Sequence, residues 1–291
     1  MELITTLIPQ PGEENSRLGE NQIMEGASMK TVTYVGGSKG GTGKSLVSMA
    51  LVDYFRRTFL EDKILLIETD SSNPDVGRLY DTPDGMPIKK EREGVDIEGI
   101  HLDEQEKGWL LMCDAIEDTD AKYIVVNSMA ASNLAIQAQG SLFEDSIKRL
   151  NISNFNVFWV MNRNKDSTTL LRDFLSHIKS AAVYPILNLY FGQEDEFAFY
   201  RSSLDIQQMI KERGGRQLLF PNMNDLIADK LYTDEKNFEE LLTTDEKAAH
   251  RLKVGMRTSL ERWLYKVKQI FDEIYVPALP AKEAVSSEGS D

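Results

Sequence analysis

Residues 36–45 read GGSKGGTGKS, a glycine-rich segment with two lysines and a terminal serine. The segment follows an apolar run at residues 31–35 and opens a stretch of helical periodicity. In this setting glycines let backbone N–H groups turn onto phosphate oxygens, and the positive end of the helix dipole adds to the attraction. Lys44 would reach the outer phosphates and the Ser45 hydroxyl would hold Mg²⁺. The segment therefore predicts a nucleotide phosphate site, the alternative being a glycine-rich turn with a solvated lysine.

Acidic and amide side chains follow three further apolar runs. Glu68 and Asp70 follow the second run, Asn127 the third and Asn162 the fourth. Because ligands bind at the carboxyl edge of open parallel sheets, and Asp70 lies one helix and one strand after Lys44, we expect Asp70 near the phosphate segment. Asp70 could instead cap the turn at residues 71–74, or do both, and Asn162 could cap the turn that follows it.

The pattern KGGTGKS at residues 39–45 resembles the deviant Walker A motif of a P-loop ATPase family. That family includes the partition ATPase ParA, the division regulator MinD, the nitrogenase iron protein and the arsenical-pump ATPase. The resemblance rests on Lys39 directly before Gly40, and Ser38 stands where the usual consensus has glycine. It covers roughly residues 30–221 in strand order.

The resemblance implies ATP and Mg²⁺ as ligands and a homodimer that sandwiches the nucleotides. Lys39 would be catalytic by reaching the phosphates held by the partner subunit, as an arginine finger does. Asp70 would be catalytic by organising the attacking water and the metal, and Glu68 matches the first acid of the same acid-x-acid pattern. Ser45 and Asp70 would be metal-site residues, and the switch-like segment at residues 73–75 adds a weaker metal-side candidate, Asp75.

One departure from the family pattern concerns the metal. Family members usually carry aspartate where Asn127 stands, and that acid holds a Mg²⁺-bound water. An asparagine keeps an acceptor oxygen but loses the charge that a hard cation prefers. Asn127 would therefore act through a water at most, which predicts slow hydrolysis or a greater dependence of the metal on Asp70 and Ser45.

Base recognition is assigned to the end of the fourth run. Family members often carry Asn-Arg or Asn-Lys there, and an amide has the donor and the acceptor that suit a purine edge. The full nucleotide-binding set implied by the resemblance is Gly40, Gly41, Thr42, Gly43, Lys44, Ser45, Leu46, Asn162 and Arg163.

The elements that must position these residues alternate along the chain. Strands are expected at 31–35, 63–67, 123–126, 157–161, 184–191 and 216–220, and the helices between them include 142–150, 168–180 and 204–211. Runs without polar alternation favour a parallel sheet covered on both faces. The sequence predicts an α/β fold, a doubly wound, mostly parallel sheet with a P-loop, plus helical C-terminal additions.

Two segments fall outside this alternation. Residues 81–120 are acidic, with a hairpin expected at 94–102 and a helix at 109–116, and residues 222–275 are expected to be all helical. The predicted division is an irregular extension at 1–28, one nucleotide-binding domain at 29–275 and a disordered tail at 276–291. Met29 could be the translation start.

Composition excludes several classes of function. Lys plus Arg number 33 against 47 Asp plus Glu, a net charge of −14, which excludes a generally basic nucleic-acid coater. The single cysteine, Cys113, excludes a disulfide framework, a cysteine-rich zinc site and the nitrogenase-type cluster, and is expected to be buried. With neither a targeting segment nor a membrane span in sight, we expect a cytoplasmic protein.

The C-terminal helical region carries seven bases and one acid between residues 247 and 268. Three interpretations stay open: DNA contact, membrane contact, and solvated bases on a helix whose apolar stripe, including Trp263 and Phe271, packs on the sheet. We favour packing for the stripe.

The sequence predicts a nucleotide-dependent, dimerising ATPase of the ParA/MinD type that acts in plasmid partition, mobilisation or conjugative transfer. The Ile-Glu-Thr-Asp segment at residues 67–70, Asn127 and the acidic charge resemble MobD- and TraL-like plasmid proteins in particular. The alternative is an ATP-gated adaptor with little hydrolysis that recruits a partition, relaxosome or transfer protein.

Overall fold

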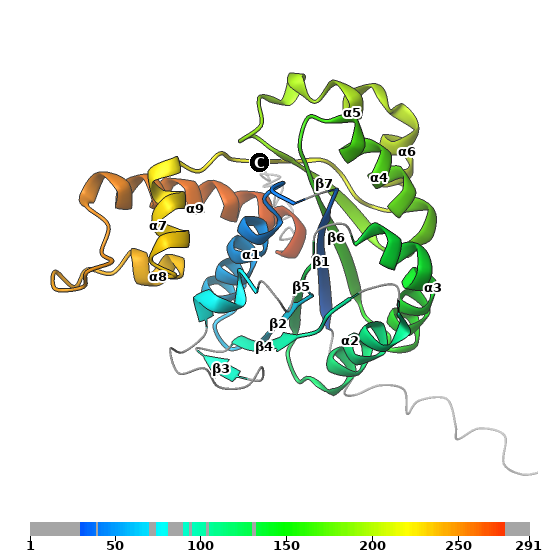
Figure 1. Cartoon of the computed structure of the whole chain (residues 1–291), viewed down its shortest axis with the longest axis horizontal. Helices are drawn as coiled ribbons and strands as arrows, with labels where there is room; N and C mark the ends of the chain where they lie inside the picture. Colours follow the sequence, from blue (N-terminus) through cyan, green and yellow to red (C-terminus); the bar gives the residue numbers. More distant parts are fainter. Residues whose placement is uncertain are drawn as a thin grey trace, which may run out of the picture.

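The apolar runs of the sequence form the strands of one sheet (Figure 1). The structure is a computed structural model, and it describes residues 30–38, 40–69, 74–80, 90–92, 95–102, 105–129 and 132–276. In that part of the chain the strand order is β3-β4-β2-β5-β1-β6-β7-β8, parallel throughout except for β3 against β4. The strands are β1 (Thr31–Gly37), β2 (Ile64–Glu68), β3 (Lys90–Arg92), β4 (Val95–Gly99), β5 (Tyr123–Asn127), β6 (Asn154–Met161), β7 (Ala182–Asn188) and β8 (Leu218–Phe220).

Helices cover both faces of this sheet (Figure 1). They are α1 (Lys44–Thr58), α2 (Glu106–Asp118), α3 (Asn133–Arg149), α4 (Lys165–His177), α5 (Ala198–Ser202), α6 (Leu204–Glu212), α7 (Asp225–Thr233), α8 (Phe238–Leu241) and α9 (Val254–Tyr275), with short 3₁₀ helices η1 (Gly77–Tyr80) and η2 (Glu194–Glu196). Helices α2, α3, α4 and α6 pack on one face, and α1, α7, α8 and α9 on the other. The predicted doubly wound α/β fold is confirmed.

The buried side chains form two clusters, one on each face of the sheet. Trp109 and Phe143 lie in the first cluster together with Cys113, which is buried as predicted. Phe55 and Phe271 lie in the second. Because both faces of the strands are covered, their apolar runs show no polar alternation.

Helix α9 completes the second face. Its stripe of Leu260, Trp263, Val267 and Phe271 is buried, and Trp263 Nε1 donates to the Pro221 carbonyl at 2.8 Å. The predicted packing of this stripe is therefore confirmed. Neither α9 nor any other described helix combines the length and the apolar character that a membrane crossing requires.

Two expectations about the elements need correction. The acidic segment at 81–120 does not stand outside the alternation, because β4 extends the sheet in parallel beside β2 and α2 buries Trp109 and Met112. Helix α3 begins at Asn133 rather than near residue 142. In its first half Ala135 and Ile136 are buried apolar side chains, whereas Leu134 is exposed, so the apolar stripe is weak in the sequence.

The predictions for residues 1–28, for the tail from 277 onward, and for Lys39, Asp70 and residue 73 concern residues outside the described part of the chain.

Candidate functional site

The loop between β1 and α1 has the backbone that its glycines predict. Gly43 precedes α1 with φ of 98°, in the left-handed region that favours glycine. A Cβ at this position would lie 2.5 Å from Asn188 Nδ2. Asn188 ends β7, and its Nδ2 donates to the Thr42 carbonyl at 2.9 Å. Glycine at position 43 therefore permits both the turn and the hydrogen bond from Asn188 to the loop.

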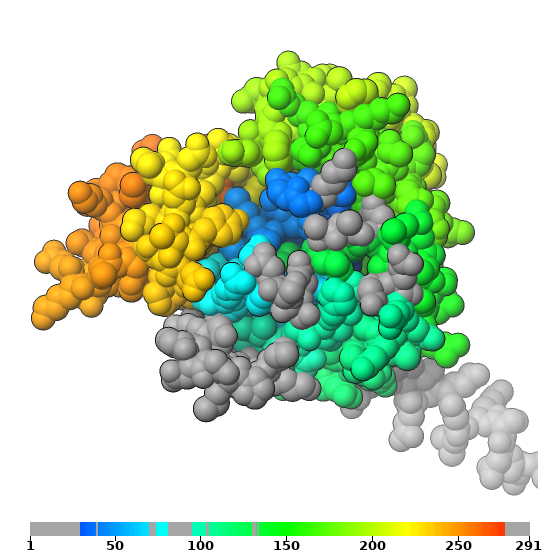
Figure 2. All heavy atoms as spheres, in the orientation of Figure 1, coloured from blue at the N-terminus to red at the C-terminus, as the bar shows by residue number. Residues whose placement is uncertain are grey.

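The start of α1 has the character of an anion site. The N-cap residue is Gly43, which has no side chain to cap this end of the helix, and the first turn carries no acid. The N–H groups of a helix start and the helix dipole together attract phosphate. Lys44 is buried here and Ser45 is half-buried. In Figure 2 part of the blue segment, which includes the loop and α1, reaches the surface in the middle of this face.

A hydroxyl and a carboxylate meet beside the loop. Ser45 Oγ donates to Asp75 Oδ2 at 3.4 Å, so the residues that follow β2 return to the start of α1. Both oxygens are ligands that Mg²⁺ accepts, and this ion usually completes its shell with nucleotide oxygens and water. Ser45 and Asp75 therefore fit a magnesium ion bound with a nucleotide.

We expect Asp75→Asn to raise the Mg²⁺ concentration needed for ATP binding by about tenfold, because one charged oxygen ligand is lost. The measurement is a titration of a fluorescent ATP analogue at increasing Mg²⁺. Asp229→Asn removes an exposed acid on α7 and serves as the matched control. An unchanged Mg²⁺ requirement in Asp75→Asn would exclude Asp75 from the metal site.

Asn127 is held by two buried partners. It ends β5 in register with Glu68 at the end of β2. Its Nδ2 donates to Glu68 Oε2 at 2.8 Å, and its Oδ1 accepts from the Ser48 hydroxyl on α1 at 2.9 Å. Aspartate here would place a second carboxylate against Glu68, which explains the neutral side chain. The role of Asn127 on a metal-bound water stays a prediction.

Glu68 ties the edge of the sheet to the segment that carries Asp75. Its Oε1 accepts from the backbone N–H groups of Val76 at 2.8 Å and Gly77 at 2.7 Å. Burial raises the pKa of Glu68 above its usual value, and the hydrogen bonds from Asn127, Gly77 and Val76 partly offset that rise. Glu68 therefore positions the Asp75 segment from inside the protein.

A chain of hydroxyls links the loop to the predicted adenine residue. The Ser38 and Ser167 hydroxyl oxygens lie 2.8 Å apart, and Ser167 Oγ donates to Asn162 Oδ1 at 2.8 Å. The non-consensus serine at position 38 thus has a partner. Asn162 Oδ1 also accepts from the Asn164 N–H at 3.0 Å, so the capping alternative is realised. The role of Asn162 in recognising a base stays a prediction.

Arg163 lies on the surface, and its guanidinium forms an ion pair with Glu196. The Leu46 side chain packs against the core cluster around α1, so only its backbone could face a nucleotide. The nucleotide-binding roles of both residues stay predictions.

The structure thus brings most of the predicted residues to one edge of the sheet, while Lys39 and Asp70 lie outside the described residues. Sequence reasoning missed Ser48 and Asn188. A signal for Asn188 was present, because it follows an apolar strand as Asn127 and Asn162 do. No comparable signal marks Ser48, which is one polar residue among many on a helix.

No model of a known protein family matches the chain. A curated relative does: the chain is 32% identical over 245 residues to Protein MobD of Acidithiobacillus ferrooxidans, covering 84% of this chain and 98% of that protein. The chain belongs to the MobD family. The resemblance to MobD-like plasmid proteins that the motifs predicted is confirmed.

Solved structures share the fold of this MobD-family chain. One is the septum site-determining protein MinD complexed with Mg-ADP from Pyrococcus horikoshii, 13% identical over 82% of this chain and 96% of that chain, with a TM-score of 0.50. Another is a plasmid partition protein from Borrelia burgdorferi bound to AMPPNP, 14% identical over 81% of this chain and 99% of that chain, with a TM-score of 0.50. At these identities the likeness shows the fold, that of MinD/ParA-type nucleotide-binding ATPases.

Proposed function

We propose that this MobD-family chain is an ATP-binding switch ATPase. The observation that carries the proposal is the start of α1 behind its N-cap glycine, where buried Lys44 and the Ser45–Asp75 pair lie together. These groups supply the positive charge, the N–H donors and the oxygen ligands that Mg-ATP requires. Bound Mg²⁺ would neutralise charge on the phosphates, and the chain would hold and orient them.

The proposed switch is a homodimer with two ATP molecules sandwiched between the subunits. Lys39 supplies its cation to the partner's phosphates and Asp70 orients the attacking water, as the motif implies. Catalysis then requires two subunits, so the nucleotide state sets the oligomeric state. We assign residues 29–275 to this single domain and place 1–28 and 276–291 outside it.

The proposed biological role is plasmid mobilisation, partition or conjugative transfer. It rests on the similarity to Protein MobD and on the shared fold with a plasmid partition protein. Its partner would be a partition, relaxosome or transfer protein. We place the protein in the cytoplasm, where ATP is available. Direct DNA contact would use exposed bases of the 247–268 region, including Arg262 and Lys266, and salt-sensitive duplex binding would be its signature.

One feature favours a second function: the Asn127 side chain forms hydrogen bonds with Ser48 and Glu68. With a neutral amide held inside the protein, a charged metal ligand is missing from that strand end. An adaptor that binds ATP, dimerises and recruits its partner with little hydrolysis would have this property.

Phosphate release from Mg-ATP, measured beside particle mass by light scattering, separates the two functions. For the switch we expect turnover and an ATP-dependent doubling of mass, with Asp70→Ala at least about a hundredfold slower while still binding ATP. For the adaptor the mass doubles without phosphate release. A chain that binds no ATP under these conditions would overturn both functions.

A further inference from the structure

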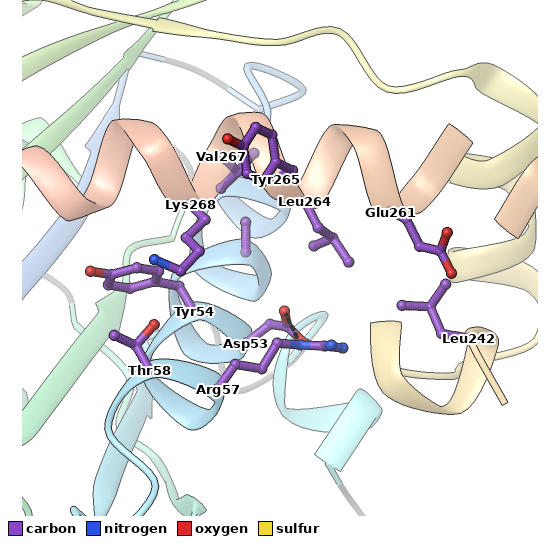
Figure 3. A pocket seen from close by; sticks show the side chains of 11 residues that line it. Asp53, Tyr54, Arg57, Thr58, Leu242, Glu261, Leu264, Tyr265, Val267 and Lys268 are labelled. Carbon is purple, nitrogen blue, oxygen red and sulfur yellow. Dashed lines mark hydrogen bonds and ion pairs between the residues drawn. The ribbon is translucent and has the colours of Figure 1, made fainter. Parts of the chain in front are cut away.

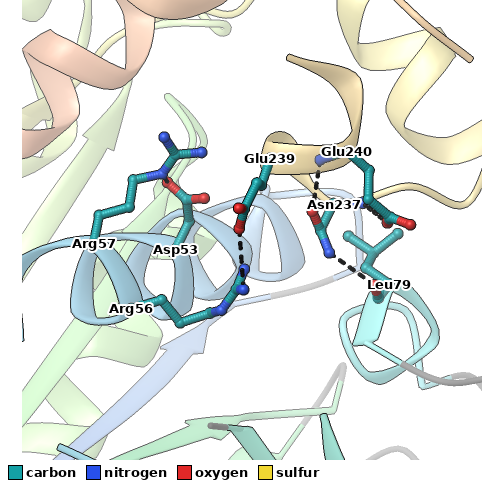
Figure 4. Close-up of polar contacts among 7 residues, drawn as sticks. All are labelled: Asp53, Arg56, Arg57, Leu79, Asn237, Glu239 and Glu240. Carbon is teal, nitrogen blue, oxygen red and sulfur yellow. Dashed lines mark hydrogen bonds and ion pairs between the residues drawn. The ribbon is translucent and has the colours of Figure 1, made fainter. Parts of the chain in front are cut away.

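The segment that carries Asp75 has an inner and an outer anchor. At the inner anchor the Glu68 carboxylate accepts from two backbone N–H groups of the segment, at 2.8 and 2.7 Å. At the outer anchor Asn237, which precedes α8, donates through Nδ2 to the Leu79 carbonyl of η1 at 3.4 Å (Figure 4). A displacement of this segment on nucleotide binding can therefore pass inward through Glu68 or outward through α8.

The outer anchor leads to a part of the molecule that is not closely packed. Glu239 of α8 is exposed and pairs with Arg56 of α1 at 3.1 Å (Figure 4). A pocket of about 230 Å³ lies between α1 and α9, and its walls include Leu242, just after α8, and Val267 of α9 (Figure 3). Close packing transmits a displacement, whereas side chains beside a space can shift into it. The outward path is therefore the weaker of the two.

The inner anchor leads to a closely packed residue, Thr69. Thr69 directly follows Glu68 and is buried, with a relative exposure of 0%. Its N–H and its hydroxyl donate to the Asn127 carbonyl at 3.1 and 3.2 Å. The same hydroxyl accepts from the Met129 N–H at 2.7 Å. Asn127 is the last residue of β5 and Met129 lies beyond it, so one side chain joins the chain that leaves β2 to the chain that leaves β5.

The chain that leaves β5 continues to α3. Ser132 directly precedes α3, and its Oγ accepts from the Tyr34 hydroxyl of β1 at 3.1 Å. That bond ties the start of α3 to β1, whereas the Thr69 hydroxyl ties Met129 to the end of β2. Because Asp75 lies in the segment that follows β2, the Thr69 hydroxyl connects this segment with the chain that leads to α3.

We propose that Thr69 is a positioning residue that couples the Mg-ATP site to the start of α3. Nucleotide and metal bound beside Asp75 act through Glu68 and Thr69 on Met129, and so stabilise the first turn of α3. Leu134 is exposed in that turn, so the surface of the chain there responds to the nucleotide. The inference rests on the proposed function and adds to it the path by which α3 responds.

Hydrogen exchange of the full chain, followed by mass spectrometry with and without Mg-AMPPNP, tests the proposal. In the wild type the amides of residue 129 and of the first turn of α3 should exchange at least about threefold more slowly with the nucleotide bound, because binding stabilises their closed form. Thr69→Val keeps the branched shape and removes the hydroxyl. Its affinity for Mg-AMPPNP should stay within about threefold of the wild type, while the slowing at residue 129 and at α3 is lost. Slowing at residues 75–77 should remain.

Two further variants separate coupling from stability. Thr69→Ser keeps the hydroxyl and should restore the slowing at residue 129 and at α3. Thr33→Val is the matched control, because Thr33 is buried on β1 and its hydroxyl lies 2.8 Å from the Tyr275 hydroxyl of α9. A purely structural loss speeds exchange with and without the nucleotide and leaves their difference unchanged, as we expect for Thr33→Val.

Equal slowing at residue 129 and at α3 in Thr69→Val and in the wild type overturns the proposal. Slowing at α8 and α9 in place of α3 in the wild type also overturns it, in favour of the outward path. A wild type that binds no Mg-AMPPNP overturns the proposed function and this inference with it, and the affinity measurement shows that failure separately. Should Thr69→Val fail to fold, Thr69→Ala removes the hydroxyl without placing a methyl group against the Met129 N–H and must show the same loss.

Discussion

Replacing Asn127 by aspartate is expected to destabilise the fold near neutral pH and to give no gain in ATP turnover. The Asn127 amide donates to Glu68 and accepts from Ser48, so an aspartate loses the donor and faces a second buried carboxylate. The free energy of unfolding should fall by about 3 kcal/mol at pH 7, since a buried charged acceptor is left unpaired. Restoring the residue typical of the family would therefore damage this site.

The loss of stability in Asn127→Asp should depend on pH. Two carboxylates in contact share a proton, which raises their pKa values in the folded state above those of the unfolded chain. The folded state then binds more protons than the unfolded state at intermediate pH, so stability falls as pH rises. Urea unfolding should show a small difference from the wild type near about pH 4 and a growing difference toward pH 8.

The double variant Glu68→Gln with Asn127→Asp is the matched control. It holds one carboxylate, as the wild type does, with the donor and acceptor exchanged between the two strand ends. The glutamine oxygen can still accept from the N–H groups of Val76 and Gly77, and its amide nitrogen can donate to the new carboxylate. Stability should return toward that of the wild type. Asn127→Asp with unchanged stability and faster turnover would show that residue 127 faces the metal and not Glu68.

The sequence predicted the fold because its signals are repeated. Apolar runs without alternation, each followed by a helical stretch, predict a parallel sheet covered on both faces, and the two clusters confirm it. The start of α3 was predicted too late in the sequence, because the first half of this helix buries few apolar side chains. The place of β4 was missed because it lies in an acidic segment, and its pairing with β2 depends on contacts distant in sequence.

The candidate site was predicted as far as local motifs reach. The glycine loop, Lys44 and Ser45 form one continuous segment, so their geometry follows from the residues themselves. The partners of Asn127 could not be read in this way, because Ser48 and Glu68 come from a helix and a strand that meet only in the fold. Asn127 could be identified as a departure from the family pattern, but its physical reason required the three-dimensional arrangement.

Lys39→Ala is expected to abolish turnover while leaving ATP binding nearly intact. If Lys39 acts on the phosphates of the partner subunit, each nucleotide is still held by the Lys44 of its own subunit. Loss of a cation that stabilises the transferred phosphoryl group costs about a thousandfold or more in rate. Lys44→Ala should lose ATP binding itself, so the two lysines are distinguished by binding and phosphate release measured on the same samples.

A mixing experiment decides whether Lys39 acts across the dimer. Lys39→Ala and Asp70→Ala are each inactive alone, but a mixed dimer joins the intact Asp70 of one subunit to the intact Lys39 of the other at a single site. In an equal mixture half the dimers are mixed and each has one complete site of two, so activity should return to about a quarter of the wild-type value. A mixture as inactive as its components would place Lys39 at its own subunit's nucleotide, and full turnover by Lys39→Ala alone would make it a solvated loop lysine.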